Sequence, residues 1–435
     1  ALCVAFAGSS VVLAAGDLWS LYQSAQVNDA TFAAAKAAHE ADSTAKAQGR
    51  AYLLPNAKVT SSFSHTDTDS LYYGDYNSRV YGASIVQPLF DLGRFFTYKQ
   101  SLASVSMGDA KFEAAKKELI QRVTKAYFEV LVAQDKLFLA EAELATVEGE
   151  LAQAQRLYSH GEGTITDVHN LEARKSLVEA DVVSARNELA QKKTNLAYIT
   201  GIFVDEVLPL REDIPLEVPQ PADVKEWIEL AKQKSPYIMY QASSADYQKQ
   251  EWNKQRSQFL PTANLVLSKT VSNKDLITYG RVSEIRVDTA AVQLQMPIFE
   301  GGYTLAKTKE SFFRYRQAVE QLRATESDIA NRITNAYMNI VNGVSRIKAL
   351  REAVKAQEIS VESTRKGYEA GIRTITDILN AQKDYYSARQ KLAEARSLYV
   401  VNIVDLKAYS GLLSDSDLML INSWLQGSSS IVSMR

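Results

Sequence analysis

A short pattern that occurs twice constrains this chain more than any other feature. The tetrapeptide Thr-Ile-Thr-Asp occupies 164–167 and returns 210 residues later at 374–377, each time just after a glycine. Other residues match at the same spacing: Ala126-Tyr127 with Ala336-Tyr337, Tyr158 with Tyr368, Gly161 with Gly371, and Gly201 with Gly411. A fixed period of this length indicates a duplicated unit. Each half of the chain is therefore expected to fold on the same plan.

Long helical patterns flank both copies of the tetrapeptide. One runs from about Gly93 to His160 and the other from about Tyr303 to Lys366. A helix of that length spans roughly 100 Å, which no compact domain needs. Apolar residues recur at intervals of three and four, typical of a coiled-coil stripe; in the first half they are Leu137, Ala140, Leu144, Val147, Leu151, Ala154 and Tyr158. The segments 161–167 and 371–377 are therefore predicted to be the tips of two helical hairpins.

Prolines bracket a second kind of segment in each half. Residues 56–87 lie between Pro55 and Pro88, and residues 262–295 lie between Pro261 and Pro297. Each segment holds two partly alternating runs with a polar loop between them, which predicts a β-hairpin. Each strand is about ten residues long, enough to cross an outer membrane when tilted. The run at 281–296 changes phase near Asp288, which predicts a bulge or a strand longer than the membrane is thick.

The number of predicted strands has a consequence for assembly. Two repeats supply four strands, too few to close a barrel, since small barrels need about eight. An open sheet edge in lipid leaves backbone groups unsatisfied at several kcal/mol each. If these strands cross a membrane, the protein must oligomerise. A dimer would supply eight strands and a trimer twelve, and the residues alone do not choose between them.

The ends of the chain differ in composition from the repeats. The first segment is apolar and ends in small residues, typical of the remnant of a secretory signal peptide; lipidation at Cys3 stays open. The last segment contains a Gly-Ser-Ser-Ser run that predicts disorder. The expected organisation is a signal remnant (1–16), a first repeat (17–200), a Pro-rich linker (201–221), a second repeat (222–413) and a C-terminal tail (414–435).

Several classes of function find no support in the sequence. The net charge of −2 gives no reason to expect nucleic-acid binding. His160 and His169 flank the first tip without other residues at metal-ligand spacing, so no metal site is predicted. The sequence has no phosphate-binding lysine motif, nucleophile elbow or zinc-protease motif. We therefore expect neither an enzyme nor a cofactor, and any energy for transport must come from a partner.

The combination of these features resembles the TolC family of outer-membrane factors. The resemblance rests on the tandem repeat, the proline-bracketed strand pairs and the second tip, residues 367–381, and it extends from Asp17 to about Leu413. It implies a mainly α-helical protein with a β-barrel part. The implied assembly is a homotrimer with a 12-stranded β-barrel in the outer-membrane lipid of a Gram-negative bacterium. A 12-helix α-barrel would cross the periplasm.

The resemblance also implies a function. The protein would be the passive exit duct of a tripartite export machine, opened by a periplasmic adaptor (a membrane fusion protein) and an inner-membrane ABC transporter or proton-driven pump. Type I protein secretion is favoured because a lipobox is missing and the second tip is close to the family pattern. Efflux of drugs or small toxic compounds is the alternative. A soluble helical scaffold is a remote alternative, which explains the stripes but not the strand pairs.

Residues at the two tips carry the implied roles. The periplasmic gate is assigned to Asp167, Tyr368, Arg373, Asp377 and Asn380. Asn380 stands where the family pattern has a second carboxylate, so a trimer would hold one carboxylate ring and block divalent cations less. Contact with the adaptor is assigned to Gly161, Glu162, Gly163, Gly371 and Ile372. Because the first tip lacks apolar residues, a dedicated adaptor is expected.

A simpler role for the same tip residues is local and structural. Thr166-Asp167 and Thr376-Asp377 open helices, where a hydroxyl or carboxylate caps free N–H groups. The two tip glycines are then residues that end the incoming helices. These capping roles are compatible with gating and with adaptor contact.

Overall fold

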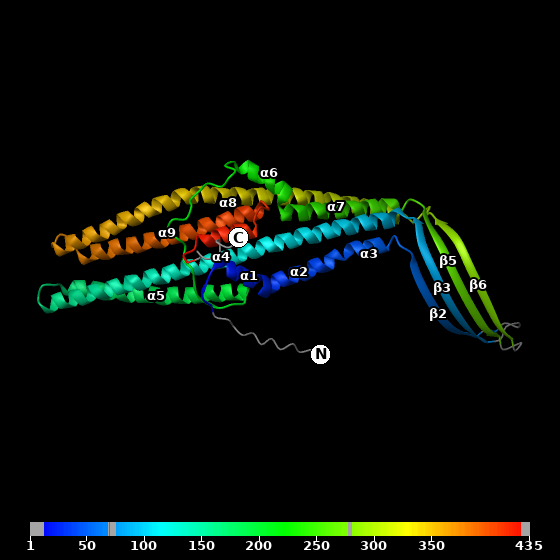
Figure 1. The fold of residues 1–435 in the computed structure, drawn as a ribbon, viewed down its shortest axis with the longest axis horizontal. Coiled ribbons are helices and arrows are strands. Elements are labelled where there is room, and N and C mark those ends of the chain that lie inside the picture. Colours follow the sequence, from blue (N-terminus) through cyan, green and yellow to red (C-terminus); the bar gives the residue numbers. More distant parts are fainter. Residues whose placement is uncertain (1–12, 68, 70–74, 277–280, 428–435) are drawn as a thin grey trace. The chain divides into compact units, whose positions relative to one another are not determined.

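The computed structural model describes residues 13–67, 69, 75–276 and 281–427 (Figure 1). The chain is mainly helical, with one four-stranded and one two-stranded sheet. The helices are α1 (Leu18–Asn28), α2 (Ala30–Ser43), α3 (Ala45–Ala51), α4 (Leu92–Ser159), α5 (Ile165–Thr200), α6 (Val224–Lys234), α7 (Pro236–Ser257), α8 (Tyr303–Glu369), α9 (Ile375–Tyr409) and α10 (Asp415–Ser423). The strands are β1 (Leu13–Gly16), β2 (Asn56–Thr66), β3 (Tyr76–Phe90), β4 (Val204–Val207), β5 (Thr262–Leu276) and β6 (Arg281–Gln295).

The chain forms two compact units. The hairpin unit comprises 1–36, 112–238 and 326–435, and the sheet unit comprises 37–111 and 239–325. The long helices α4 and α8 contribute residues to both units. Within the described ranges, no helix combines the length and hydrophobicity that a bilayer-spanning helix requires.

The sheet unit contains the two predicted β-hairpins. The strand order is β2-β3-β5-β6, and every neighbouring pair is antiparallel. The pairing of β3 with β5 joins the first repeat to the second. The expectation of a bulge near Asp288 is wrong, because β5 and β6 pair without a register shift from Thr262–Gln295 to Leu276–Arg281. The register shift of this sheet lies instead between Pro88 and Phe90, in β3.

Exposure differs between the inner and the outer strands of this sheet. In the inner strand β3, residues 79, 81, 83 and 85 are exposed, whereas residues 78, 80, 82, 84 and 86 are buried or half-buried. Successive side chains alternate between faces, so the even-numbered residues of β3 occupy the more enclosed face. The outer strand β2 is exposed at almost every position, on both faces.

The hairpin unit contains the two helical hairpins. The helix α5 folds back along α4, and α9 folds back along α8 (Figure 1). The repeated tyrosines explain part of the duplication. The hydroxyl of Tyr127 donates to the carbonyl oxygen of Leu208 at 2.9 Å, and that of Tyr337 donates to the carbonyl oxygen of Ala222. Both tyrosines therefore anchor the backbone of the segment that joins the repeats.

The predicted single helix over 17–49 is wrong in one respect, because the structure divides it into α1, α2 and α3. The first break is at Asp29, whose carboxylate accepts the N–H of Phe32 at 2.6 Å and so caps α2. The same carboxylate binds the Arg122 guanidinium with both oxygens, at 2.8 and 2.9 Å. This ion pair, on a residue that is 3% exposed, fixes the start of α2 against α4.

Both ends of the chain are more ordered than the sequence predicts. Leu13–Gly16, the last residues of the predicted signal remnant, form β1 and pair in parallel with β4; residues 1–12 lie outside the described ranges. The expectation of a disordered tail is wrong for residues 414–427. Leu418, Ile421 and Leu425 are buried, and Asn422 accepts the N–H of Trp19 at 3.1 Å. Apolar burial against α1 therefore orders α10.

Candidate functional site at the helical tips

The two tips share one backbone geometry. Gly161 and Gly371 have φ values of 77° and 74°, a left-handed conformation that glycine adopts without strain. In the first tip, the N–H of Gly161 donates to Tyr158 and the N–H of Glu162 to Leu157, at 3.0 and 2.9 Å. The second tip repeats these bonds with Gly371 on Tyr368 and Ile372 on Gly367, both at 2.8 Å. These bonds use carbonyl groups that the ending helix leaves free.

The helices that leave the tips are capped by threonine, but not by the threonines predicted. The caps are Thr164 and Thr374, two residues before Thr166 and Thr376. The hydroxyl of Thr374 accepts the N–H of Asp377 at 3.3 Å, and the Asp377 carboxylate accepts the N–H of Thr374 at 2.9 Å. This reciprocal pair is a capping box. In the first tip, the Thr164 hydroxyl accepts the N–H of Asp167 at 3.1 Å.

The second tip places an ionised carboxylate beside a cation. The hydrogen bond from the Thr374 backbone, then that from its hydroxyl, and then the positive charge of Arg373 lower the pKa of Asp377 below its ordinary value. The Arg373 side chain folds back over Gly367, where a Cβ atom would lie 2.8 Å from Arg373 Cγ. The lack of a side chain at Gly367 therefore makes room for Arg373 to lie near Asp377.

A shared apolar cluster joins the two hairpins behind the tips. Its buried members come from α4, α5 and α9: Val147, Ala154, Val168, Leu171, Ile375 and Ile378. Tyr368 of α8 packs against this cluster. Burial raises the pKa of Tyr368, and the negative charges of Asp167 and Glu150 add to the effect. The structure thus brings Tyr368 near Asp167, two residues that the sequence placed in different repeats.

The other predicted tip residues remain at the surface. Gly161, Glu162, Gly371, Ile372 and Asn380 are exposed, and Gly163 is half-buried. The side chain of Ile372 is 80% exposed, a large apolar group on a turn. The structure therefore brings together Asp167 with Tyr368, and Arg373 with Asp377, and leaves the predicted adaptor contacts available on the outside of the tips.

Sequence reasoning missed a polar seam between the hairpins. Glu150 of α4 accepts the amide of Gln382 of α9 at 2.6 Å and pairs with Arg365 of α8 at 3.2 Å. Burial raises the pKa of Glu150, an effect that Gln382 and Arg365 oppose. In the described part of the chain, Glu150 Oε2 and Gln382 Oε1 are buried without a hydrogen-bond partner. The only signal in the sequence was a charge beside the apolar stripe, and most such charges face solvent.

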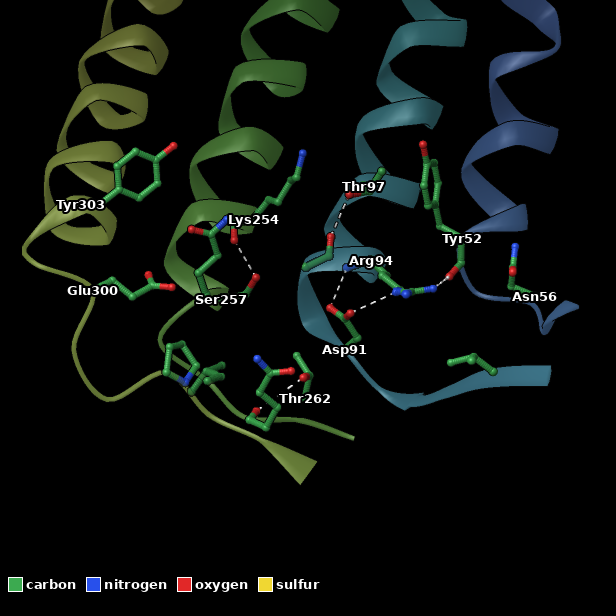
Figure 2. A pocket seen from close by; sticks show the side chains of 16 residues that line it. Tyr52, Asn56, Asp91, Arg94, Thr97, Lys254, Ser257, Thr262, Glu300 and Tyr303 are labelled. Carbon is green, nitrogen blue, oxygen red and sulfur yellow. Dashed lines mark hydrogen bonds and ion pairs between the residues drawn. The ribbon is translucent and has the colours of Figure 1, made fainter. Parts of the chain in front are cut away.

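A polar cavity of about 1030 Å³ lies in the sheet unit, where helices meet strands (Figure 2). Arg94 donates to the Asp91 carboxylate at 3.1 Å and to the carbonyl oxygen of Tyr52 at 3.1 Å. Asp91 and Glu300 occupy equivalent places in the two repeats, and each precedes a long helix. Glu300 accepts the hydroxyl of Thr304. Side chains of both repeats thus line one polar hollow at the base of the sheet.

Metal chemistry finds no candidate among the residues described. No group of three or more His, Cys, Asp and Glu side chains in those ranges is arranged to hold an ion.

Comparison with known proteins places the chain in a family. The sequence model described as outer membrane efflux protein matches residues 21–202 and 227–412. The alkaline protease secretion protein AprF of Pseudomonas aeruginosa is 31% identical over 92% of this chain and 85% of its own length. The proteases secretion protein PrtF of Dickeya chrysanthemi is 28% identical over 96% of this chain and 92% of its own.

A solved structure shows the same fold. The outer membrane protein VceC of Vibrio cholerae superposes with a TM-score of 0.77, at 17% identity, over 91% of this chain and 96% of its own. The match to the family model covers both repeats and both tips. The chain therefore belongs to the outer membrane efflux protein family, and it is an outer-membrane channel protein with most of its length in the periplasm, not an enzyme.

Proposed function

We propose that three copies of this chain form the exit duct of a tripartite machine for type I protein secretion. Each copy would give four strands to a 12-stranded barrel and four helices to each level of a 12-helix tunnel. The open edges of the four-stranded sheet support this assembly, because unpaired backbone groups are costly in lipid. The enclosed face of β3 would line the lumen, and the exposed face would contact lipid.

The tips are proposed as the periplasmic gate. The observation that carries this proposal is the contact between the two hairpins behind the tips, where Tyr368 packs on a cluster built from α4, α5 and α9. Asp167, Tyr368, Arg373, Asp377 and Asn380 would close the tunnel. Opening would move α8 and α9 away from α4 and α5.

The seam at Glu150 is proposed as the lock that this movement breaks. Separation of the hairpins would break the ion pair of Glu150 with Arg365 and expose the buried oxygens of Glu150 and Gln382 to water. An unpaired buried acceptor costs roughly 1–3 kcal/mol, and hydration would recover that cost. The seam therefore holds the hairpins together by geometry while it offsets part of the cost of opening.

The gate is tested by single-channel conductance in lipid bilayers. Replacement Tyr368→Ser or Arg373→Ser should raise the conductance, because each removes a side chain that holds the second tip. The matched control is Tyr158→Ser, at the equivalent place in the first tip, which is 48% exposed. If both gate variants conduct like the wild-type protein, neither residue gates the tunnel.

The lock has a test of its own. Glu150→Arg should raise the conductance, because it places two cations together in the seam. Combination with Arg365→Glu should lower the conductance again, because the charges then attract in the opposite sense. A double variant that conducts as much as Glu150→Arg alone would argue against the pair as a lock.

Contact with an adaptor is proposed at the exposed residues of the tips, Gly161, Glu162, Gly163, Gly371 and Ile372. The exposed Ile372 side chain supports this assignment, because an apolar group on a turn has no structural need to face water. Ile372→Ser should weaken cross-linking to the adaptor of the same operon or strain, whereas Ile359→Ser, 64% exposed on α8, should not. Equal loss in both variants would contradict a contact specific to the tip.

The cargo is proposed to be a protein. Two relatives of high similarity are named for protease secretion, which supports this choice. The efflux of small toxic compounds remains the second candidate, because the matching family is described by efflux. Deletion of the gene should remove a protein from the culture medium. Unchanged secretion together with greater sensitivity to toxic compounds would favour efflux.

A further inference from the structure

The two outer strands of the sheet leave long edges uncovered. Residues 56–65 of β2 and 284–296 of β6 are exposed at every position. Directly after β6, Ile298 and Phe299 are 95% and 87% exposed. By contrast, the inner strands β3 and β5 are half-buried along most of their described length. The uncovered apolar residues therefore concentrate at the two sheet edges.

Internal symmetry relates these edges to the inner strands. Pro55 and Pro261 precede equivalent strands, β2 and β5, and Pro88 and Pro297 mark equivalent ends, after β3 and β6. The strand pairing obeys the same equivalence. Asn56 is opposite Val86 in the first hairpin, and their equivalents Thr262 and Gln295 are opposite each other in the second. The two hairpins therefore have the same register, residue for residue.

One strand pair within the chain is the template for a pair between copies. The strand β3 ends the first repeat and pairs with β5, which begins the second. When copies follow one another around a barrel, β6 ends one copy and β2 begins the next. The same repeat-to-repeat junction therefore occurs again, this time between two chains.

The template sets the register of that second junction. In β3–β5, Ile85 is opposite Leu267 and Ser84 is opposite Ser268. The equivalents of the first pair are Leu294 in β6 and Ser61 in β2. The equivalents of the second pair are Gln293 and Ser62.

We propose that β6 binds the β2 strand of a second copy of this chain, antiparallel, with Leu294 opposite Ser61 and Gln293 opposite Ser62 of the neighbouring copy. In this register, Met296–Phe299 continues β6 along the neighbour's 56–59, as Gln87–Phe90 continues β3 within one chain. The high exposure of Ile298 and Phe299 then has a cause, because their covering strand belongs to the next copy. This inference rests on the proposed barrel and adds its register.

The faces of the sheet provide an independent check. Leu294 is opposite Ala263, and Ser61 is opposite Tyr81, which is opposite Val271. Ala263 and Val271 are both odd-numbered residues of β5, so Leu294 and Ser61 share one face of the sheet. A slip by one residue would exchange lumen-facing and lipid-facing side chains. Only a slip by two residues keeps the faces, and the experiment must exclude it.

Paired cysteines measure the register directly. The background is Cys3→Ser, which removes the single cysteine of the chain. Two double variants place cysteines opposite each other: Leu294→Cys with Ser61→Cys, and Gln293→Cys with Ser62→Cys. Opposite Cα atoms lie roughly 4.5–5.5 Å apart, and consecutive pairs alternate between the two spacings. Both values fall within the range of about 4.4–6.8 Å that disulfides need.

The matched controls represent a slip by two residues. They combine Leu294→Cys with Val59→Cys or with Phe63→Cys, whose diagonal spacing is about 7–8 Å. On oxidation in the membrane, the proposed pairs should form covalent trimers on a non-reducing gel, at several times the yield of the controls. Each single cysteine variant should migrate as a monomer after denaturation.

Two outcomes contradict the register and leave the trimer intact. If a control pair cross-links more than the proposed pairs, or if no pair cross-links in protein that light scattering identifies as a trimer, the inferred junction is wrong. A protein that is monomeric in detergent before oxidation contradicts the proposed barrel itself. Light scattering on the same preparation therefore separates failure of the register from failure of the proposed function.

Discussion

The two helical hairpins share a backbone plan but differ in what holds their helices together. Five ion pairs join α4 to α5: Lys136–Glu188, Arg174–Glu143, Lys175–Glu148, Arg186–Glu141 and Lys192–Glu129. The ion pairs recorded for α8 in the described residues instead join it to itself or to α4. A contact between α8 and α9 is the hydrogen bond from Asn339 to Asn402, at 3.3 Å.

This difference shows what a duplication retains and what it loses. Glycine at a positive φ and threonine at a cap are demanded by the backbone, so both copies keep them. Surface charges are not demanded by the backbone, and the two copies have diverged in them. Exposed pairs contribute roughly 0.2–1 kcal/mol each, so five of them make the first hairpin the stiffer one. We therefore expect α8 and α9 to be the part that moves.

The largest effect should come from breaking the cluster that both hairpins share. Leu171 is 0% exposed there, and Leu171→Ala should lower the free energy of unfolding by about 2–5 kcal/mol because it leaves a cavity. Amide exchange should accelerate in both hairpins behind the tips. The control Leu177→Ala, at a residue 61% exposed on the same helix, should have little effect. Faster exchange in the first hairpin alone would show that the cluster does not couple the two.

A smaller effect should come from the ion pairs of the first hairpin. The side chains of Arg174 and Glu143 are only 18% and 13% exposed. Arg174→Gln leaves Glu143 without its cation, which should cost about 1–3 kcal/mol and bring the first hairpin closer to the second in amide exchange. The control is Lys355→Gln, whose pair with Glu352 is 70% and 75% exposed and should contribute less than about 0.5 kcal/mol. Equal losses would mean that burial of the pair is irrelevant.

A smaller effect again should separate the two caps. Thr164→Ala and Thr374→Ala should each cost about 1 kcal/mol of helix stability. Asp377→Asn should loosen the first turn of α9 more than Asp167→Asn loosens that of α5, because the capping box is complete in the second tip. Amide exchange of the first-turn residues measures both. The same response in both tips would remove this part of the comparison.

The smallest effect is a change with pH, and it should have opposite signs at the seam and at the second tip. Burial raises the pKa of Glu150 above its ordinary 4.5, so the folded seam binds a proton more readily than the unfolded chain. The seam should therefore gain stability as the pH falls through the raised pKa towards 4.5.

Asp377 behaves in the opposite way. Its pKa is lowered from 3.8, so its contribution to the capping box is complete above 3.8 and is lost as the pH falls through the lowered value. Amide exchange around Glu150 and around Asp377, followed from pH 7 downwards and corrected for intrinsic rates, measures both effects. Glu150→Gln should remove the pH dependence at the seam. A seam that loosens as the pH falls towards 4.5 would contradict the assigned cause.

Much of the fold was predictable because local signals agreed over long stretches. The apolar stripe, the scarcity of glycine and proline and the repeated tip predicted both hairpins, and the bracketing prolines predicted both strand pairs. The breaks at Asp29 and Thr44 were not predictable, because a propensity for helix is high on both sides of each. At Asp29, a distant cation, Arg122, decides where the new helix begins.

The candidate site divides in the same way. The turn residues of the tips were visible because a left-handed turn needs glycine and a helix start needs a cap, and these are demands of a few consecutive residues. The seam of Glu150, Arg365 and Gln382 was not visible, because its members lie on three helices and each looks like a surface residue by itself.

The sequence by itself determined the duplication, the type and approximate length of each element, and the family. Periodicity and turn chemistry act within a few residues, so they can be read along one chain. Only the tertiary structure decided the strand register, the order of the tail and the contact between the hairpins. Those features depend on which distant side chains become buried together, and burial is a property of three-dimensional neighbours, not of neighbours in sequence.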